Sequence, residues 1–317
     1  MRIGYPCVNY TIGCRCNRTF RLKSYSDRYL KDTVESNLSC LLQTLEYNVK
    51  HRLFFFRITS DLIPFASHPI CTFPWQAHFR TTFLEIGAFI KKHQIRISMH
   101  PGQFTLINAE KESVFKRSLA ELMYHIHVLE SLGLDATSKI QIHIGGLYRN
   151  REASLRRFIR RYHQLDDCIR KHLVIENDDY GFSLRDCLRI HHKTGIPVIF
   201  DTFHHSINYH GETRIDSLNA VEKTWNTRID GMMMIDYTSQ QPDARKGTHA
   251  TTLDTYDFKE FIQESRSFDF DLMLEIKDKE CSAVKAVKIL KTDPRFFPGP
   301  PAVTKRKIRK YASRSVQ

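Results

Sequence analysis

The sequence predicts a single α/β domain built as a (β/α)8 TIM barrel. Eight short apolar runs alternate with longer amphipathic segments along the 317 residues, and no repeat or Ser/Gly-rich linker divides them. Alternating strands and helices form parallel sheets, and eight such units close into a barrel of about 250 residues. The apolar runs that we expect to be strands are Arg2–Cys7, Leu53–Thr59, Ile95–Met99, Ile140–Ile144, Leu173–Ile175, Val198–Phe200, Met232–Ile235 and Leu272–Leu274.

The segments between these runs have the apolar periodicity of helices. Between Lys111 and Leu132, apolar residues recur every three or four positions from Phe115 to Leu129, which places them on one helical face. Further helices are expected over Asp27–Val49, Gln76–His93, Arg151–Arg170, Ser183–Lys193, Ile215–Trp225 and Asp257–Ser265. We expect the last unit to be irregular. An open, doubly wound sheet is the alternative fold, but no Gly-x-Gly-x-x-Gly motif follows the first strand.

The charge of the chain points to a polyanionic partner. The formal net charge is +13 and the isoelectric point is near 9.4. The segment Lys305–Arg314 carries six of these charges, so the rest of the chain is still basic at +7. We therefore divide the chain into a barrel domain, residues 1–295, and a basic C-terminal tail, residues 296–317. A basic protein without a nucleic-acid partner is the alternative that composition leaves open.

The eight cysteines indicate an intracellular environment. None forms a Cys-x-x-Cys motif, and a chain of this length without a signal peptide has little need of disulfides. We expect reduced thiols in a cytoplasmic, bacterial-type protein that associates with the nucleoid when on DNA. Cys14 and Cys16 lack the matching pair of a zinc site. No apolar run reaches the roughly 18 residues of a membrane span.

Residues that bind metals follow six successive predicted strands. The carboxyl ends of barrel strands meet at one rim, where active sites are built. Each residue alone has an ordinary explanation, because a histidine can pack in a core and a carboxylate can cap a helix. Crowded together, however, the carboxylates would repel one another unless cations neutralised them. Imidazole and carboxylate ligands suit Zn, Mn or Fe. The residues are His100, His143, Glu176, Asp201, Asp236 and Glu275, with His204 and His249 just beyond two of the strand ends.

Seven stretches of the chain form a specific combination of motifs. They are GYPCVN (Gly4–Asn9), RITSDLIPFASH (Arg57–His68), SMHPGQF (Ser98–Phe104), IHIGG (Ile142–Gly146), ENDD (Glu176–Asp179), DTFHH (Asp201–His205) and LEIKDKE (Leu274–Glu280). Together they resemble the UV damage endonuclease family. The resemblance runs from Arg2 to about Lys291, and a more distant likeness is to endonuclease IV, an abasic-site enzyme with a three-metal barrel.

This resemblance implies a centre of two or three divalent ions, commonly manganese. One ion would be held by His100, His143 and Glu176. A second would share Glu176 and add Asp201, Asp236 and Glu275. A third would use His204 and His249, and His68, in the loop after the second strand, matches a family histidine near this cluster.

The chain departs from the family pattern on the seventh strand. Where some members have Lys-x-His, with a modified lysine, this chain has Met234 and Asp236. The carboxylate of Asp236 can bind the same cations, whereas the thioether of Met234 cannot replace the lysine. The third ion is therefore the one that this departure affects.

The resemblance also implies the activity, which is nicking of duplex DNA on the 5′ side of UV photoproducts such as pyrimidine dimers, with abasic sites as a further lesion. Glu176, as the bridging ligand, would be the catalytic residue most sensitive to change. Gln103 and Phe104 are placed to wedge into the base stack, while Tyr5 and Asn9 would line a pocket for the flipped dimer. For Phe104, simple loop packing is the alternative. Phosphate contacts are expected from Arg149, Arg151 and the basic tail.

Three other functions remain open on the same barrel. A metal-dependent sugar isomerase and an abasic-site endonuclease would use similar ligands. A non-catalytic DNA-damage-binding protein would keep a degenerate site. The basic body disfavours the isomerase, and the candidate ligands still in place disfavour the degenerate site. We expect a monomer whose partner is damaged double-stranded DNA, with no membrane partner.

Overall fold

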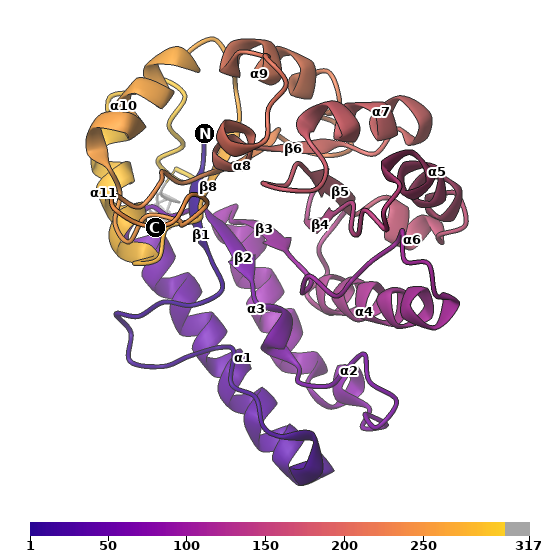
Figure 1. The fold of residues 1–317 in the computed structure, drawn as a ribbon. Helices are drawn as coiled ribbons and strands as arrows, with labels where there is room; N and C mark the ends of the chain where they lie inside the picture. Colours follow the sequence, from indigo (N-terminus) through magenta and orange to yellow (C-terminus); the bar gives the residue numbers. More distant parts are fainter. Residues whose placement is uncertain (302–317) are drawn as a thin grey trace, which may run out of the picture.

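The computed structural model describes residues 1–301 and confirms the predicted barrel. Eight parallel strands close in sequence order, and β1 pairs with both β2 and β8 (Figure 1). Each strand overlaps its predicted run. The strands are β1 (Ile3–Pro6), β2 (Phe55–Ile58), β3 (Arg96–Met99), β4 (Lys139–His143), β5 (Leu173–Glu176), β6 (Val198–Asp201), β7 (Met234–Tyr237) and β8 (Asp271–Leu274). The segment Lys305–Arg314 lies outside the described residues.

Helices surround the strands (Figure 1). They are α1 (Asp27–Lys50), α2 (Trp75–His78), α3 (Arg80–His93), α4 (Glu112–Ser131), α5 (Arg151–Tyr162), α6 (Asp167–Arg170), α7 (Leu184–Thr194), α8 (Thr202–Ile207), α9 (Arg214–Glu222), α10 (Thr255–Glu264) and α11 (Glu280–Leu290), with short 3-10 turns at η1 (Leu22–Ser24) and η2 (Ser60–Leu62). No helix within residues 1–301 is long and apolar enough to cross a membrane.

Three helix predictions need correction. The helix expected over Gln76–His93 is divided at Phe79, and the one over Arg151–Arg170 is divided after Tyr162. The last unit is regular, because α11 buries Ala283, Ala286, Val287 and Leu290 at helical spacing. This apolar stripe directly follows the polar stretch LEIKDKE, and for that reason no helix was predicted here.

Polar side chains line the barrel interior at both ends. Alternate residues of a strand point to the same side, so every second residue faces inward. In β4, Lys139 bonds Asp230 and Gln141 bonds Asp236, so Lys139, Gln141 and His143 all face inward. The intervening Ile140 and Ile142 are buried outside the strands among the apolar residues that pack against the helices. The predicted strands are therefore apolar toward the helices and polar along part of the barrel axis.

A buried ion-pair network closes the end of the barrel opposite the strand carboxyl ends. Arg96 donates to Asp271 at 2.9 Å, and Lys139 donates to Asp230 at 2.6 Å. Arg96 also donates to the backbone oxygen of Asp230 at 3.2 Å, which links the two pairs. Charges taken out of water in this way are stable only while each keeps its partner.

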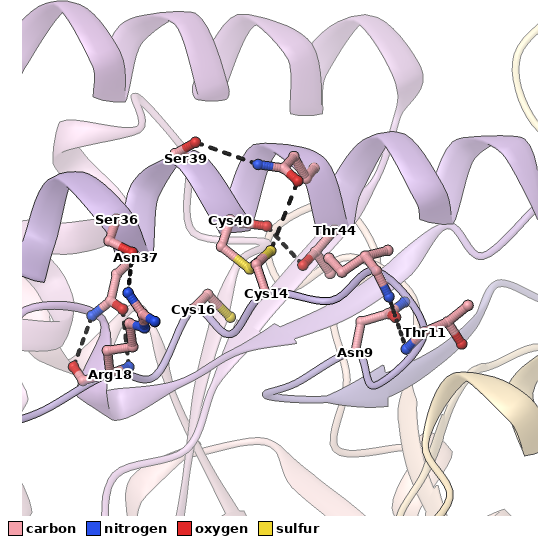
Figure 2. Close-up of a disulfide and its surroundings, with 12 residues drawn as sticks. Asn9, Thr11, Cys14, Cys16, Arg18, Ser36, Asn37, Ser39, Cys40 and Thr44 are labelled. Atoms are coloured by element: carbon pink, nitrogen blue, oxygen red, sulfur yellow. Dashed lines mark hydrogen bonds between the residues drawn. A yellow bond between two sulfur atoms is a disulfide. The ribbon is translucent and has the colours of Figure 1, made fainter.

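The chain just after residue 295 packs on the barrel, and two of the cysteines are paired. The backbone NH of Phe297 donates to the oxygen of Met1 at 2.9 Å, and the Arg2 guanidinium lies 4.5 Å from the Phe297 ring centroid, so the chain still contacts the barrel beyond residue 295. The expectation of reduced thiols throughout is wrong for Cys14 and Cys40, which form a disulfide (Figure 2). Their Cα atoms are 5.9 Å apart in space, a separation that suits a disulfide. The two cysteines are 26 positions apart in the chain, and no local sequence motif predicts their pairing.

We predict that Asp271→Leu lowers the free energy of unfolding by about 3–5 kcal/mol, because it leaves the buried guanidinium of Arg96 without its carboxylate. Adding Arg96→Met in the same chain should recover much of the loss, since neither charge then remains buried alone. Denaturant unfolding of the two single variants and the double variant measures both effects. If the double variant loses as much free energy of unfolding as the two single variants together, Arg96 and Asp271 are not coupled.

Candidate metal centre

The predicted ligands that follow the six strands converge at the carboxyl ends of those strands. Their donor atoms fall into three overlapping groups, each with all atoms within 4.8 Å of one another. The groups are His100, His143 and Glu176; Glu176, Asp201 and His204; and Asp201, Asp236 and Glu275. Glu176 and Asp201 each belong to two groups. The strand alternation that brings β3 to β8 to one rim therefore builds a single continuous cluster.

The first group has the geometry of ligands around one ion. Glu176 Oε2 lies 3.5 Å from His100 Nε2 and 3.8 Å from His143 Nε2. Donor atoms this far apart can each lie about 2.1 Å from a shared cation. His100 Nδ1 is 2.8 Å from the oxygen of Pro101, so Nδ1 donates there and Nε2 keeps its lone pair for the cluster.

The second group contains a buried oxygen without a hydrogen-bond partner. Asp201 Oδ1 accepts from the backbone NH groups of Phe203 at 2.8 Å and His204 at 2.7 Å, and so caps α8. Its other oxygen, Oδ2, is buried and has no hydrogen-bond partner among the described residues. It lies 3.4 Å from His204 Nδ1, which is itself 3.1 Å from Glu176 Oε1. A buried carboxylate oxygen of this kind fits a cation.

The grouping of His204 differs from the one that the resemblance implied. His204 lies with Glu176 and Asp201, whereas His249 is in none of the three groups. The centroids of the two rings are 6.0 Å apart. His249 Nδ1 is 2.9 Å from the backbone oxygen of Glu275, which orients its ring at the edge of the cluster.

Two residues of the site escaped the sequence predictions, Arg57 and Gln141. Arg57 Nη2 lies 2.8 Å from Asp236 Oδ2 and 2.7 Å from Gln141 Oε1, and Nη1 donates to Glu275. The amide of Gln141 in turn donates to Asp236 at 2.6 Å and to Glu176. The available signal was a charged residue within the apolar run LFFFRIT and an amide within IQIHI, because a buried polar side chain requires a partner.

Burial and neighbouring charges separate the pKa values of the carboxyl groups. Burial raises the pKa of Asp236 to about 7, against the opposing pull of Arg57. For Glu275, burial acts to raise the pKa, but the Arg57 guanidinium together with the imidazoles of His100 and His249 lowers it to about 2. Glu176 is held well below its ordinary pKa by the imidazoles of His143, His100 and His204, although burial acts the other way. Burial and the carboxylates around it raise the pKa of Asp201 well above its ordinary value. Of these four carboxyl groups, Asp236 and Glu275 contact the Arg57 guanidinium, and within residues 1–301 no other guanidinium lies against the four, an arrangement that favours added cations.

Two further positions lie outside the cluster. His68 is exposed, and its Nδ1 accepts from the backbone NH of Ile70 at 3.1 Å. It lines a cavity that also contains His100. Met234 is fully buried in β7, so it contributes packing at the position where some family members carry a lysine.

Two cavities open beside the ligands. One, of about 570 Å³, is bordered by His100, Gln103, His143, Tyr180 and His204 among others. The other, of about 780 Å³, is bordered by His68, His100 and Phe104. Phe104 is 68% exposed, and one side of its ring lies over the backbone of Gly102.

The side chains of Tyr5, on β1, and Asn9, in the loop that follows β1, are buried in the core. Asn9 Nδ2 donates to the Tyr5 hydroxyl at 2.9 Å, and that hydroxyl donates to Asn48 Oδ1 at 2.7 Å. Both side chains are buried and neither borders the two cavities. Their part in DNA binding stays a prediction. Of the expected phosphate contacts, Arg149 is exposed, whereas Arg151 forms an ion pair with Asp186.

Known proteins share this barrel and, at higher identity, its sequence. The family described as UV-endonuclease UvdE matches residues 1–294. The UV DNA damage endonuclease of Clostridium perfringens (strain 13 / Type A) is 42% identical over 295 residues, which are 92% of this chain and 71% of that protein. The UV DNA damage endonuclease of Bacillus thuringiensis subsp. konkukian (strain 97-27) is 33% identical over 264 residues, 82% of this chain and 83% of that protein.

Solved structures have the same fold. The crystal structure of SacUVDE superposes with a TM-score of 0.88 at 47% identity and covers 92% of this chain and 98% of that one. Endonuclease IV from Thermus thermophilus superposes with a TM-score of 0.55 at 14% identity, over 92% and 98% of the two chains, which shows a common fold. Because the family model matches residues 1–294, which span the whole barrel, the chain belongs to the UV-endonuclease UvdE family.

Proposed function

We propose that this nuclease cuts the phosphodiester backbone of duplex DNA on the 5′ side of UV photoproducts, pyrimidine dimers above all, and also acts at abasic sites. The observation that carries the proposal is the convergence of His100, His143, Glu176, Asp201 and His204 at the barrel mouth. The curated relatives are named UV DNA damage endonuclease, and the chain is an endonuclease of the same family. The net charge of +13 suits DNA as the substrate.

The centre that we propose holds two or three divalent ions, with manganese first and zinc or iron as the alternatives. His100, His143 and Glu176 would hold one ion, and Glu176, Asp201 and His204 a second. When bound, such ions lower the pKa of a water molecule and stabilise charge on the attacking and leaving oxygens. His68, Asp236, His249 and Glu275 are the remaining candidate ligands.

The other residues of the site hold these ligands in place. Within residues 1–301, Arg57 supplies the one guanidinium that contacts the carboxylates of the cluster, and it orients Asp236 and Glu275. Gln141 links Asp236 to Glu176 through its amide. Because both side chains lie in the barrel interior, the carboxylates keep their positions while DNA binds at the mouth.

The competing functions have less support. Sugar epimerases share the fold at 10–15% identity, which carries no activity across. A non-catalytic binding protein would not need the convergent donors of the three groups, including the unpartnered Asp201 Oδ2. A pure abasic-site endonuclease would lack preference for irradiated DNA, so a comparison of nicking on irradiated and intact duplex distinguishes it.

For lesion recognition we propose Gln103 and Phe104 as a wedge that fills the gap left by an extruded dimer. Both follow His100 in the β3–α4 loop, and Phe104 borders one cavity while Gln103 borders the other. The high exposure of Phe104 supports this role over loop packing. An aromatic ring at this position can stack on a base and replace the lost base-base contact.

We predict that Glu176→Gln abolishes nicking of irradiated duplex in the presence of manganese and largely preserves binding of damaged DNA, because it removes a shared ligand and no DNA contact. Gel assays of incision and binding on the same irradiated substrate measure the two properties. Glu130→Gln, an exposed change on α4, should cut like the parent protein. Incision by Glu176→Gln at the parental rate would refute the ligand assignment.

Removing metal is expected to destabilise the protein. A ligand present at 100 times its Kd contributes about 2.7 kcal/mol to the free energy of unfolding. Treatment with EDTA should therefore lower the melting temperature, and added Mn²⁺ should restore it, because the cation relieves repulsion among buried carboxylates. In Glu176→Gln the rise on adding Mn²⁺ should be smaller. Equal melting curves with and without metal would argue against a filled centre.

Phe104→Ala should reduce discrimination between damaged and intact duplex, since stacking on a base is worth about 1–3 kcal/mol. Metal content and melting temperature should stay unchanged, and the loss should shrink on a substrate whose lesion is already unpaired. Ile229→Ala removes another exposed apolar side chain, at the opposite end of the barrel, and serves as the control. A drop in melting temperature with intact discrimination would make Phe104 a packing residue.

A further inference from the structure

The loop between β1 and α1 carries a cluster of positive charges without acidic neighbours in sequence. The first acidic residue of the chain is Asp27, so residues 7–26 contain only basic charged side chains. We call this segment the first loop. Its cationic side chains, Arg15, Arg18, Arg21 and Lys23, are all exposed. None of the four makes an ion pair with any residue in the part of the chain that the structure describes.

The first loop reaches the catalytic mouth. Thr19 borders the 780 Å³ cavity together with His100 and Phe104. At its start, the backbone NH of Tyr10 and the hydroxyl of Thr11 both donate to Glu280, at 3.0 and 2.7 Å. Glu280 begins α11, directly after the β8 end that supplies Glu275. The loop therefore forms one wall of the mouth.

Three separate anchors hold the backbone of the first loop. The disulfide joins Cys14 to Cys40 in the middle of α1 (Figure 2). Asn37, also on α1, accepts from the backbone NH of Arg18 at 2.9 Å and donates to its oxygen at 3.0 Å (Figure 2).

The third anchor is aromatic. The ring of Phe20 lies in a T-shaped arrangement against Phe65 of the β2–α2 loop, with 5.2 Å between centroids. Tyr25 packs on both rings, with centroids 6.2 Å from Phe20 and 6.0 Å from Phe65. The anchors lie at positions 14, 18 and 20, and three of the four cations, Arg15, Arg18 and Arg21, lie at or beside them.

We propose that the first loop is a preformed clamp for the phosphate backbone of the DNA next to the lesion, through Arg15, Arg18, Arg21 and Lys23. Guanidinium and ammonium groups bind phosphate oxygens strongly, and a loop already fixed in its bound shape loses little entropy on binding. Phosphate contacts of this kind position the duplex and carry no information about the bases. The clamp rests on the proposal that duplex DNA is the substrate.

A salt titration of binding tests the clamp. In the full chain, Arg15→Gln, Arg18→Gln, Arg21→Gln and Lys23→Gln are combined, and binding to irradiated and intact duplex is measured across salt concentrations. Each lost phosphate contact should reduce the slope of log K against log salt by about 0.9, so we expect a reduction of about 1.8 or more. Affinity for both duplexes should fall by a similar factor, so that the damage preference persists.

The matched control removes the same number of charges at the opposite end of the barrel. Lys50, Lys92, Lys171 and Lys193 are exposed near the C-terminal ends of α1, α3, α6 and α7. Changing all four to Gln should leave the slope close to that of the parent. Equal slopes for the loop variant and the parent, with nicking of irradiated DNA intact, would overturn the clamp alone. Absence of nicking in the parent protein would overturn the proposed function instead.

The disulfide anchor has its own test. Cys14→Ser combined with Cys40→Ser should weaken binding of both duplexes, because the loop must then be ordered on binding, while metal content stays the same. Cys168→Ser, a change at a free cysteine on α6, is the control. Parental affinity in the double cysteine variant would show that the crosslink does not preform the clamp. Melting curves of all variants identify any that are unfolded.

Discussion

The need to neutralise buried negative charge at the barrel mouth governs the rest of the site. The side chains of Glu176, Asp201 and Asp236 are almost fully buried, and Glu275 joins them at the rim. Within residues 1–301, Arg57 is the one guanidinium that contacts this group. The imidazoles around Glu176 add positive charge, and cations in the proposed centre would complete the balance. The fold makes this possible because strand pairing fixes each carboxylate before any cation binds.

The same strand pairing explains how much of the fold and the site was predictable from the sequence. A parallel barrel places every strand carboxyl end on one rim, so candidate ligands such as His100 and Glu275, far apart in the chain, could be placed near one another from strand positions alone. The way these side chains divide into groups was not predictable in this way. His204 lies on the short helix α8, whose direction is set by the cap that Asp201 forms, and this turn brings His204 to Glu176 rather than to His249.

The features that sequence reasoning missed depend on contacts across the barrel or between distant loops. Arg57 and Gln141 look like interruptions in apolar runs until their partners on β7 and beyond β8 are known. The disulfide between Cys14 and Cys40 depends on where the first loop crosses α1, which no local spacing encodes. Helix α11 was overlooked for a different reason, because its apolar stripe follows a charged stretch that has the composition of a loop.

Asp201 performs two tasks with its two oxygens, and this restricts which residues evolution can accept there. One oxygen begins α8 and the other faces the cluster. Asparagine could still cap the helix but would present a neutral group to the cation, while histidine could bind the cation but would give up the cap. Glutamate keeps the charge, yet its longer side chain moves the carboxylate away from the first turn. At position 201, the start of a helix and the composition of the cluster therefore depend on the same side chain. A substitution there would alter both the cap of α8 and the cluster.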